Sequence, residues 1–405
     1  MDDRSQRLEA AGIPPSPPVE EQRRRRKHLR ELLAAHKLDG LIIYGSGPTN
    51  PDPVRYLSGY VHPFPRARSI LVAPADGPIV LLIDTEWHQP AAQEMAWSSS
   101  VRLMPTPMPG RGRELTNAVS ETLKHCGLHG GSVGLLGTDV AGVVEAAVAG
   151  STADVDAEAG ATIWDALVAT PSEYDLRKIK ETVAIADRGL SALADACEAG
   201  RSERAVCFEV LSVMASAGAE FQHANSISTH IDLGAYAQSE SNLQPFLYTE
   251  TPIEVGEQFW VDLIACHGGY YVDCDRTVSV GKPTAEQRHI YDACVAMYEA
   301  MLKVVRPGVS GHTVWKAARD VATEYGYSDH LNGVYLGHTT GLTISTSPVV
   351  SRNASGTLIE DQLLNIEPGI HIPDVGAACI ENTLQVTASG PEVLNDASTD
   401  LIVVR

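Results

Sequence analysis

Apolar and polar positions follow a repeating order in the first part of the chain. Short apolar runs such as GLIIYG (40–45) and PIVLLI (78–83) alternate with longer amphipathic segments. Apolar runs of this length are typical of buried strands, and their alternation with helices indicates an α/β layer with a parallel or mixed sheet. We expect this domain at residues 20–165, after an extended, proline-containing arm at 1–19. Its predicted helices are 20–37, 85–96, 112–126 and 139–149, its predicted strands are 40–45, 69–73, 78–83 and 133–137, and a loop is predicted through Pro51 and Pro53.

The pattern changes near residue 166. The segment 172–200 has apolar residues at helical spacing, and Ser172 followed by charged residues is typical of a helix start. Helices gathered between antiparallel strands indicate an α+β domain at 166–405. Its further helices are expected at 203–218, 286–305 and 311–327, and its later strands within 335–344, 363–372 and 378–388.

The segment 258–283 contains two runs rich in Val, Ile, Tyr and Trp on either side of a His-Gly pair at 267–268. A tight turn at this pair would place Asp262 directly opposite Asp273, with Cβ atoms roughly 5 Å apart. Asp275 projects to the same face because side-chain direction repeats every second residue of a strand. The predicted hairpin therefore carries three carboxylates on one face.

Carboxylates that share one face of an apolar hairpin need a positive partner, because like charges repel and buried charges are paired or bind metals. Arg276 is a weak candidate, since it lies on the opposite face of the strand from Asp273 and Asp275. A solvated acidic edge is the other alternative. A divalent cation explains the pattern most economically.

Two segments near the end of the chain supply further candidate ligands. Glu367 ends the run LLNIE, and Glu381 lies in ACIEN beyond a turn, so pairing of these strands brings the two glutamates together. His338 lies in GHTTGL, where glycines let the chain approach closely and turn. One imidazole with four carboxylates suits two ions such as Mn²⁺, Fe²⁺, Co²⁺ or Zn²⁺. Two ions that share a water can activate it and polarise a carbonyl, which is hydrolytic machinery.

Composition narrows the function classes. The 405 residues exceed one ordinary core, and 44% apolar content fits a globular protein. No apolar run is long enough for a membrane span or a signal peptide, so we expect a cytoplasmic protein. A net charge of −20 argues against nucleic-acid and anionic-membrane partners; the basic run 23–27 is expected to be a solvated helix end. Seven scattered cysteines predict reduced thiols, with Cys266 and Cys274 as buried apolar residues rather than metal neighbours.

The order of the candidate ligands resembles that of a known family. An Asp followed eleven residues later by Asp, then GH, IEPG and IEN, is similar to the metal-dependent pita-bread peptidases: methionine aminopeptidase, aminopeptidase P and prolidase. The preceding α/β segment and the LRKIKE helix resemble creatinase-type proteins. The resemblance implies a homodimer. It also implies an α+β pita-bread domain that is preceded in the chain by an α/β creatinase-type domain. It implies that Asp273 and Glu381 bridge both ions and that Glu367 handles the proton of the bridging water. The metal ligands that it implies are Asp262, Asp273, His338, Glu367 and Glu381.

The substrate side of the site departs from the peptidase pattern. The peptidases usually carry His four residues before the ligand His, and His-Glu seven and eight residues after it; here these positions are Val334, Ser345 and Thr346. Those histidines hold the peptide carbonyl and stabilise the oxyanion, so the three positions are expected to contact a substrate with altered chemistry. Tyr271 shares the metal face and is a further substrate-lining candidate, with strand packing as its alternative. Asp275 stands where the family usually has Thr and is a candidate ligand or acid/base group.

The residues leave three hypotheses open. The first is a dinuclear metal-dependent hydrolase of a short peptide or modified amino acid, similar to Xaa-Pro peptidases. In it a metal-bridging water attacks the amide, and Glu367, His338 and Asp275 are the catalytic candidates. The second is a non-peptidase relative, similar to creatine or ectoine hydrolases or to a metal-dependent lyase of a small onium compound. The third is a non-catalytic binding module, which the retained ligands disfavour.

Overall fold

The computed structural model describes residues 16–405 except 47–50, 65, 99, 109, 138–141, 153, 222–229, 235–249 and 332–334, with the backbone alone at 51, 143 and 230–234. The chain divides into two compact units, and the main boundary falls between Ala169 and Thr170. Most of the predicted arm at 1–19 lies outside the described residues.

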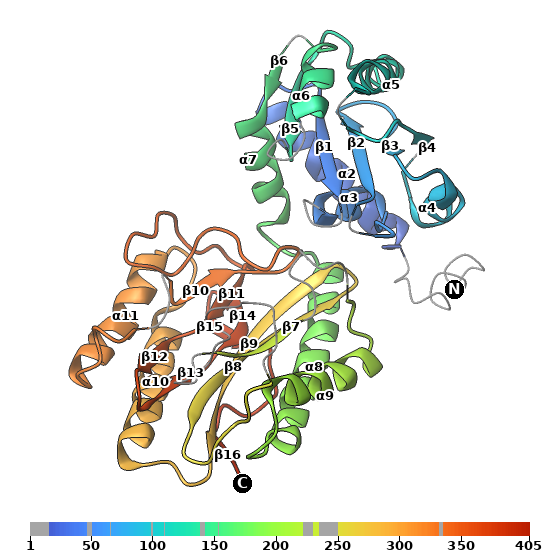
Figure 1. Ribbon diagram of the computed structural model, residues 1–405. Coiled ribbons are helices and arrows are strands. Elements are labelled where there is room, and N and C mark those ends of the chain that lie inside the picture. The colour runs from blue at the N-terminus through green and yellow to red at the C-terminus, as the bar shows by residue number, and fades with distance from the viewer. Residues whose placement is uncertain are drawn as a thin grey trace. The chain divides into compact units, whose positions relative to one another are not determined.

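The first unit is built on a six-stranded mixed sheet in the order β4-β3-β2-β1-β5-β6 (Figure 1). In the middle of this sheet, β1 pairs antiparallel with β2 and parallel with β5, which confirms the predicted α/β layer. The strands are β1 (Gly40–Ser46), β2 (Arg68–Pro74), β3 (Val80–Ile83), β4 (Ser100–Leu103), β5 (Ser132–Leu136) and β6 (Asp154–Asp156). The helices are α2 (Val19–Ala35), α3 (Pro51–Ser58), the short 3₁₀ helix η1 (Glu86–His88), α4 (Gln89–Met95), α5 (Gly112–His125), α6 (Gly142–Ala149) and α7 (Ala157–Val168).

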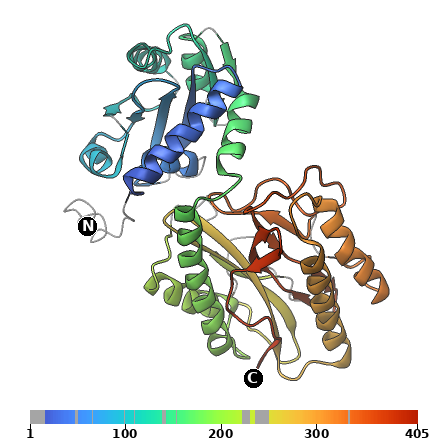
Figure 2. The same ribbon diagram turned by 180° about the vertical axis from the view of Figure 1, so that it is seen from behind.

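Helices cover both faces of this sheet. Ile42 of β1 and Val72 of β2 pack with Leu115 and Val119 of α5 and Val144 of α6 in one apolar core. On the other face α2 and α7 lie side by side (Figure 2). Strand β1 is accordingly buried along its whole length, as expected for a strand with both faces covered.

The predicted loop through Pro51 and Pro53 is wrong, because helix α3 begins at Pro51. Proline is tolerated in the first turn of a helix, where the backbone amides have no intrahelical acceptors. Val54 and Leu57 are fully buried and give this helix an apolar face. The sequence pattern also does not predict β4, β6 or α7, which are short or weakly periodic elements.

The described part of the second unit forms three sheets, in the orders β16-β9-β8-β7, β10-β11-β14-β15 and β12-β13. Its strands are β7 (His230–Gly234), β8 (Gln258–His267), β9 (Tyr270–Val280), β10 (Gly337–Thr339), β11 (Leu363–Ile366), β12 (Gly369–Ile372), β13 (Gly376–Cys379), β14 (Asn382–Thr387), β15 (Gly390–Val393) and β16 (Ile402–Val404). Its helices are α8 (Glu173–Ala196), α9 (Glu203–Ser216), α10 (Ala285–Val304) and α11 (Gly311–Glu324), which confirms the α+β class.

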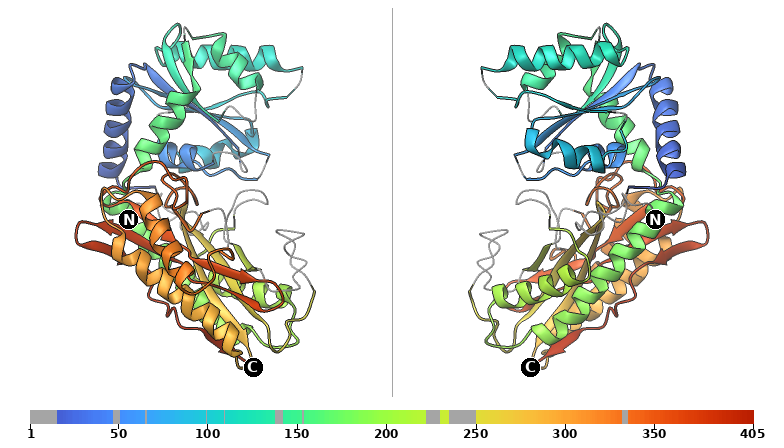
Figure 3. Two further views of the ribbon diagram at one scale, coloured as in Figure 1. Left: turned by 90° about the vertical axis from the view of Figure 1, so that its left-hand side faces the viewer. Right: turned by 90° about the vertical axis from the view of Figure 1, so that its right-hand side faces the viewer.

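The helices of the second unit lie in two pairs on opposite sides of its strands (Figure 3). Leu190 of α8 and Val210 of α9 pack against Leu263 of β8. Met297 of α10 belongs to a separate core with Ile366 of β11. The strands of the second unit therefore form two layers: the first contains the β8–β9 hairpin, and the second contains β10 to β15. Each layer has one apolar face under helices and one face turned toward the other layer.

The register of the β8–β9 hairpin differs from the predicted one. Its turn is formed by the two glycines at 268–269, with φ of 66° and 81°, and two-residue hairpin turns of this kind require positive φ at both positions. The strands therefore pair Asp262 with Asp275, while Asp273 lies opposite Ile264. The predicted pairing of Asp262 with Asp273 is wrong by two residues. A shift of two leaves every side chain on its predicted face, because that is the period of a strand.

The cysteines and the helices can be compared with what the composition predicts. Cys266 and Cys274 are buried and outside any disulfide, as predicted, and so are the other cysteines. Among the residues described, none of the helices combines the length and the apolarity that a bilayer crossing needs.

Candidate metal centre

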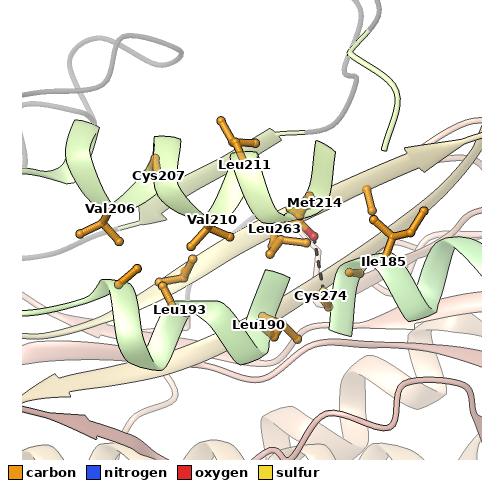
Figure 4. Packing of buried hydrophobic residues seen from close by; sticks show 14 of the residues in the cluster. Ile185, Leu190, Leu193, Val206, Cys207, Val210, Leu211, Met214, Leu263 and Cys274 are labelled. Atoms are coloured by element: carbon orange, nitrogen blue, oxygen red, sulfur yellow. Dashed lines mark hydrogen bonds between the residues drawn. The ribbon is translucent and has the colours of Figure 1, made fainter. Parts of the chain in front are cut away.

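The β8–β9 hairpin separates an apolar core from an acidic face. Leu263 and Cys274 point into the core under α8 and α9, where the Cys274 thiol donates to the Leu263 carbonyl oxygen at 3.5 Å (Figure 4). Every second residue faces the other way, which places Asp262, Asp273 and Asp275 together on the opposite face. Asp273 and Asp275 are only 7% and 4% exposed.

The second layer contributes an imidazole and two further carboxylates. His338 lies on β10, which pairs with β11, and Glu367 directly follows β11. The pairs β11–β14 and β12–β13 have the same antiparallel register. Glu367 lies between β11 and β12, and Glu381 lies between β13 and β14. The shared register therefore places Glu367 opposite Glu381. Ile366 and Ile380 belong to the core under α10 and α11, so the glutamates that follow them project toward the hairpin.

Hydrogen bonds join the two layers behind the acidic face. The Glu381 amide donates to the Asp275 carbonyl oxygen at 3.1 Å. Arg276, which is 1% exposed, donates to the carbonyl oxygens of Asp275 at 2.8 Å and Glu381 at 2.7 Å and to the Asn382 amide oxygen at 2.9 Å. Among the described residues, this guanidinium therefore braces the backbone and is not the counter-charge of the carboxylates.

The imidazole of His338 lies among the acids. Its Nε2 is 3.6 Å from a carboxylate oxygen of Asp273, 3.7 Å from one of Glu367 and 4.0 Å from one of Glu381. The structure thus brings the predicted ligands together, and Asp275 joins them. Three overlapping groups have ligand atoms within 4.8 Å of one another: Asp273, His338 and Glu381; Asp262, Asp273 and Asp275; and Asp275, Glu367 and Glu381.

The proximity of these groups changes their protonation. Burial raises the pKa of Glu367 to about 8; the attraction of His338 opposes this shift and repulsion from Asp273 adds to it. Burial and the negative charges of Asp273 and Glu367 raise the pKa of Glu381 well above its ordinary value. Burial disfavours the charged form of His338, but its hydrogen bond to Asp273 and the charge of Glu367 outweigh this effect and raise its pKa. A cation among these groups would relieve the same repulsion.

The donor set fits divalent cations. Asp273, Glu367 and Glu381 each have one buried carboxylate oxygen with no hydrogen-bond partner in the described part of the chain. Leaving such an oxygen unpaired is costly, so native proteins pair buried charges or use them to coordinate metals. One imidazole among several carboxylates is an oxygen-rich set of the kind that binds Mn²⁺, Fe²⁺, Co²⁺ or Zn²⁺, unlike the thiolate-rich set of a structural zinc site.

Family comparison agrees with this geometry. Residues 177–388, more than half of the chain, match metallopeptidase family M24. The chain belongs to metallopeptidase family M24. All six clustered residues lie inside the M24 match, and residues 25–140 match the creatinase/prolidase N-terminal domain. The second unit therefore has the pita-bread fold of the M24 family, and a creatinase-type N-terminal domain precedes it in the chain.

Individual proteins show how far the likeness extends. The Xaa-Pro dipeptidase of Pyrococcus horikoshii is 31% identical over 231 residues, which cover 57% of this chain and 64% of that protein. The solved Xaa-Pro dipeptidase from Bacillus anthracis has a TM-score of 0.77 at 21% identity, covering 95% of this chain and all of that one. The N-terminal domain of FACT complex subunit SPT16 from Eremothecium gossypii has a TM-score of 0.68 at 15% identity over 95% and 98% of the two chains. Proteins with such different names share this fold, so the fold alone does not decide activity.

The remaining residues predicted to contact substrate have different surroundings. Val334 lies outside the described residues. Tyr271 is on the acidic face, 6% exposed, and packs with Ile264 and Cys266. Ser345 lies near the Tyr335 phenol and opposes the rise that burial causes in the pKa of that phenol.

Thr346, a predicted substrate contact, forms an isolated bridge with a residue of β10. It pairs with Thr339, and their hydroxyl oxygens are 2.6 Å apart. Side chains alternate along β10, so Thr339 and its partner lie on the face opposite His338. The Thr339–Thr346 contact therefore joins the two segments, and the substrate contact of Thr346 stays a prediction.

Two polar residues near the M24 centre escape prediction from the sequence. Tyr335 lies three residues before His338, with its ring edge-on to the imidazole at a centroid distance of 5.8 Å. Asn365 lies opposite His338 in the β10–β11 ladder, fully buried, with no partner for its amide among the described residues. The only sequence signal for Asn365 is a polar residue inside the apolar run LLNI; Tyr335 has none beyond its closeness to His338.

Proposed function

We propose that this protein is a metal-dependent hydrolase that cleaves the amide bond of a short peptide or modified amino acid, with Xaa-Pro dipeptides as the first substrates to test. The observation that carries the proposal is the buried cluster in which His338 lies within 4.0 Å of three carboxylates, each with one buried oxygen that has no hydrogen-bond partner among the described residues. The names of the matched M24 relatives support the substrate class.

The ligand groups support two divalent ions, Mn²⁺, Co²⁺, Fe²⁺ or Zn²⁺. One group contains Asp273, His338 and Glu381, and another contains Asp262, Asp273 and Asp275, so only Asp273 is common to both. In M24 chemistry, bound divalent ions would lower the pKa of a water and polarise the scissile carbonyl.

Glu367 is the proposed proton carrier. Its side chain is partly exposed, whereas that of Glu381 is almost fully buried, so Glu367 is the glutamate that a substrate can reach. Its carboxylate accepts a proton from the attacking water as the new C–O bond forms. It then gives that proton to the leaving nitrogen as the C–N bond breaks, which yields an acid and an amine. Burial raises its pKa to about 8 in the cation-free cluster, which supports a role as a proton carrier.

The test combines metal analysis with an amide panel. Wild-type protein loaded with Mn²⁺ or Co²⁺ is expected to hold the ions after gel filtration and to hydrolyse at least one member of a panel of Xaa-Pro dipeptides and acyl-amino acids. Asp262→Ala is expected to lose both bound metal and turnover, because Asp262 is a hairpin ligand that alanine cannot replace. Metal-free wild type, or full activity in Asp262→Ala, would contradict the proposal.

One observation favours a second candidate, a non-peptidase M24 hydrolase or a lyase of a small onium compound. Ser345 stands where the peptidases usually have an imidazole that holds the peptide carbonyl. A substrate-contact position that differs from that of the peptidases, next to the metal ligands that they share, supports a substrate other than a peptide. Turnover of a cyclic amidine or an onium compound, with none of an Xaa-Pro dipeptide, would decide for this candidate.

Two further properties remain predictions from the resemblance. We propose a homodimer, to be checked by light scattering of the purified protein. We also propose a cytoplasmic location, which cell fractionation would test.

A further inference from the structure

Asn365 is a fully buried polar residue inside the apolar strand β11. Its neighbours Leu364 and Ile366 belong to the core under α10, so side-chain alternation turns Asn365 the other way, toward the β8–β9 hairpin. Neither the oxygen nor the nitrogen of its side-chain amide has a hydrogen-bond partner in the described part of the chain. Native proteins pair nearly all buried polar groups, so an amide in this position needs a functional explanation.

The strand ladder shows what lies around Asn365. Its cross-strand partners are His338 on β10 and Thr383 on β14. Asp273 of the hairpin reaches both partners: its carboxylate oxygen Oδ2 is 3.6 Å from Nε2 of His338, and its carbonyl oxygen accepts from the Thr383 hydroxyl at 3.4 Å. Neighbouring strands are about 4.8 Å apart, so a residue that contacts the strands on either side of β11 lies over β11 itself. Asp273 therefore lies over Asn365.

Asp273 offers the acceptor that the amide of Asn365 lacks. Its Oδ2 faces the imidazole, whereas its other carboxylate oxygen, Oδ1, is buried and has no hydrogen-bond partner among the residues described. An amide nitrogen donates hydrogen bonds, and a carboxylate oxygen accepts them. Asn365 and Asp273 thus bring a buried donor and a buried acceptor to the same place between the two layers.

The direction of the Asp273 carboxylate matters for the whole metal centre. Asp273 belongs both to the ligand group with His338 and Glu381 and to the group with Asp262 and Asp275. A carboxylate that serves two groups must present its oxygens in fixed directions. Hydrogen bonds from residues that do not themselves bind the metal are the usual means of orienting such a ligand.

We propose that the side-chain amide nitrogen of Asn365 donates a hydrogen bond to Oδ1 of Asp273 in the cation-loaded centre, directly or through one buried water. A bound cation fixes the carboxylate, and a fixed carboxylate is a strong acceptor for an N–H group. Asn365 is a positioning residue, because it acts on the cations through Asp273. The inference rests on the metal binding of the proposed function.

Asn365→Leu tests this role, because it removes the amide and keeps a side chain of similar size. We expect the affinity for Mn²⁺, measured by competition with a chromophoric chelator, to fall at least about tenfold, the usual loss when a hydrogen bond to a metal ligand is removed. The Tm of the chelator-treated variant should equal or exceed that of wild type, since an unpaired buried amide is costly. A residue that only supports the fold would lower this Tm and leave the affinity unchanged.

Two matched substitutions serve as controls. Asn382→Leu makes the same change at a buried asparagine whose amide is paired with Arg276 at 2.9 Å and with Tyr298 at 2.7 Å. It should lower the Tm of the chelator-treated protein, because it leaves buried donors and acceptors unpaired. Asn353→Leu makes the change at an exposed position and should keep both the Mn²⁺ affinity and the Tm of wild type.

The outcomes separate this inference from the proposed function. A loss of Mn²⁺ affinity of about tenfold or more in Asn365→Leu, with no fall in Tm after chelation, supports the inference. A smaller loss of affinity, or a lower Tm after chelation, overturns it, while wild type that holds Mn²⁺ keeps the proposed metal centre. Wild type that binds no Mn²⁺ overturns both.

A second pair of variants decides the case in which Asn365→Leu does not fold. Asn365→Ser keeps a short donor, whereas Asn365→Ala keeps none. The serine variant should bind Mn²⁺ more tightly than the alanine variant, because only its side chain can still donate to Asp273. Equal affinities in the two variants would overturn the inference.

Discussion

Asp275 belongs to two of the three ligand groups, with Asp262 and Asp273 on the hairpin and with Glu367 and Glu381 in the second layer. Its side chain is 4% exposed and lies directly across the ladder from Asp262. Where the resemblance expects the uncharged hydroxyl of threonine, this chain has a further anionic oxygen donor. Hard divalent cations prefer such donors, so Asp275 should strengthen their binding.

Asp275→Asn tests this role, because the amide keeps the shape of the side chain and removes its charge. We expect the affinity for Mn²⁺ to fall at least about tenfold, the loss typical of weakening a metal site by one contact. Competition with a chromophoric chelator measures this affinity. Asp329→Asn, an identical change at an exposed position, should bind like wild type. Equal affinity in both variants would show that Asp275 is not a ligand.

At the residue scale, the sequence reveals side chains whose chemistry conflicts with their surroundings. Asp262 and Glu381 stand out because an acid in an apolar strand is costly without a partner. Tyr335 does not stand out, since tyrosine is ordinary at the edge of a strand.

At the scale of the element, the hairpin shows why faces are easier to predict than register. Strand alternation places Asp262, Asp273 and Asp275 on one face for any even shift of the pairing. The register depends instead on which two residues form the turn. The turn forms at residues 268–269 rather than at His267 and Gly268, because glycine adopts the positive φ of both turn positions without strain.

Gly268→Ala tests the contribution of this turn. Gly268 has φ of +66°, and an added Cβ would meet only ordinary contacts at 3.7 Å or more, so the cost is conformational rather than steric. We expect the second unit to lose about 1 to 2 kcal/mol of unfolding free energy, the usual penalty for a left-handed non-glycine residue. Urea denaturation followed by tryptophan fluorescence measures it. Gly142→Ala, at the start of α6 with open space around its Cα, should cost nothing; an equal loss in both variants would assign the effect to glycine replacement in general.

At the scale of the whole molecule, the protein carries a net charge of −20 and concentrates five carboxylates and one imidazole inside a single unit. The change of sequence pattern near residue 166 indicates two domains, but it does not show that all six groups converge in the second. That convergence requires two layers that are more than sixty residues apart in sequence to meet, as Asp275 and Glu381 do through their backbones. Without cations, the raised pKa values of Glu367, Glu381 and His338 favour protons on these three groups, which reduces the repulsion within the cluster.

This protonation predicts how stability depends on pH. The pKa values of Glu367, Glu381 and His338 are all raised in the folded, cation-free protein, so the folded state binds more protons than the unfolded state. For Glu367, the stabilisation by the bound proton is complete below its ordinary pKa of 4.5 and is lost as pH rises through about 8. We therefore expect the Tm of chelator-treated protein to fall from pH 5.5 to pH 8.5.

Cation binding should act in the opposite direction over the same range, because the cation displaces these protons and its affinity rises with pH. The difference in Tm between Mn²⁺-loaded and chelator-treated protein should accordingly widen from pH 5.5 to pH 8.5, as measured by calorimetry at fixed ionic strength. Glu367→Gln removes one of the titrating groups and should flatten the pH dependence of the chelator-treated protein. A difference in Tm that is independent of pH would mean that cations, if bound, do not replace protons at this cluster.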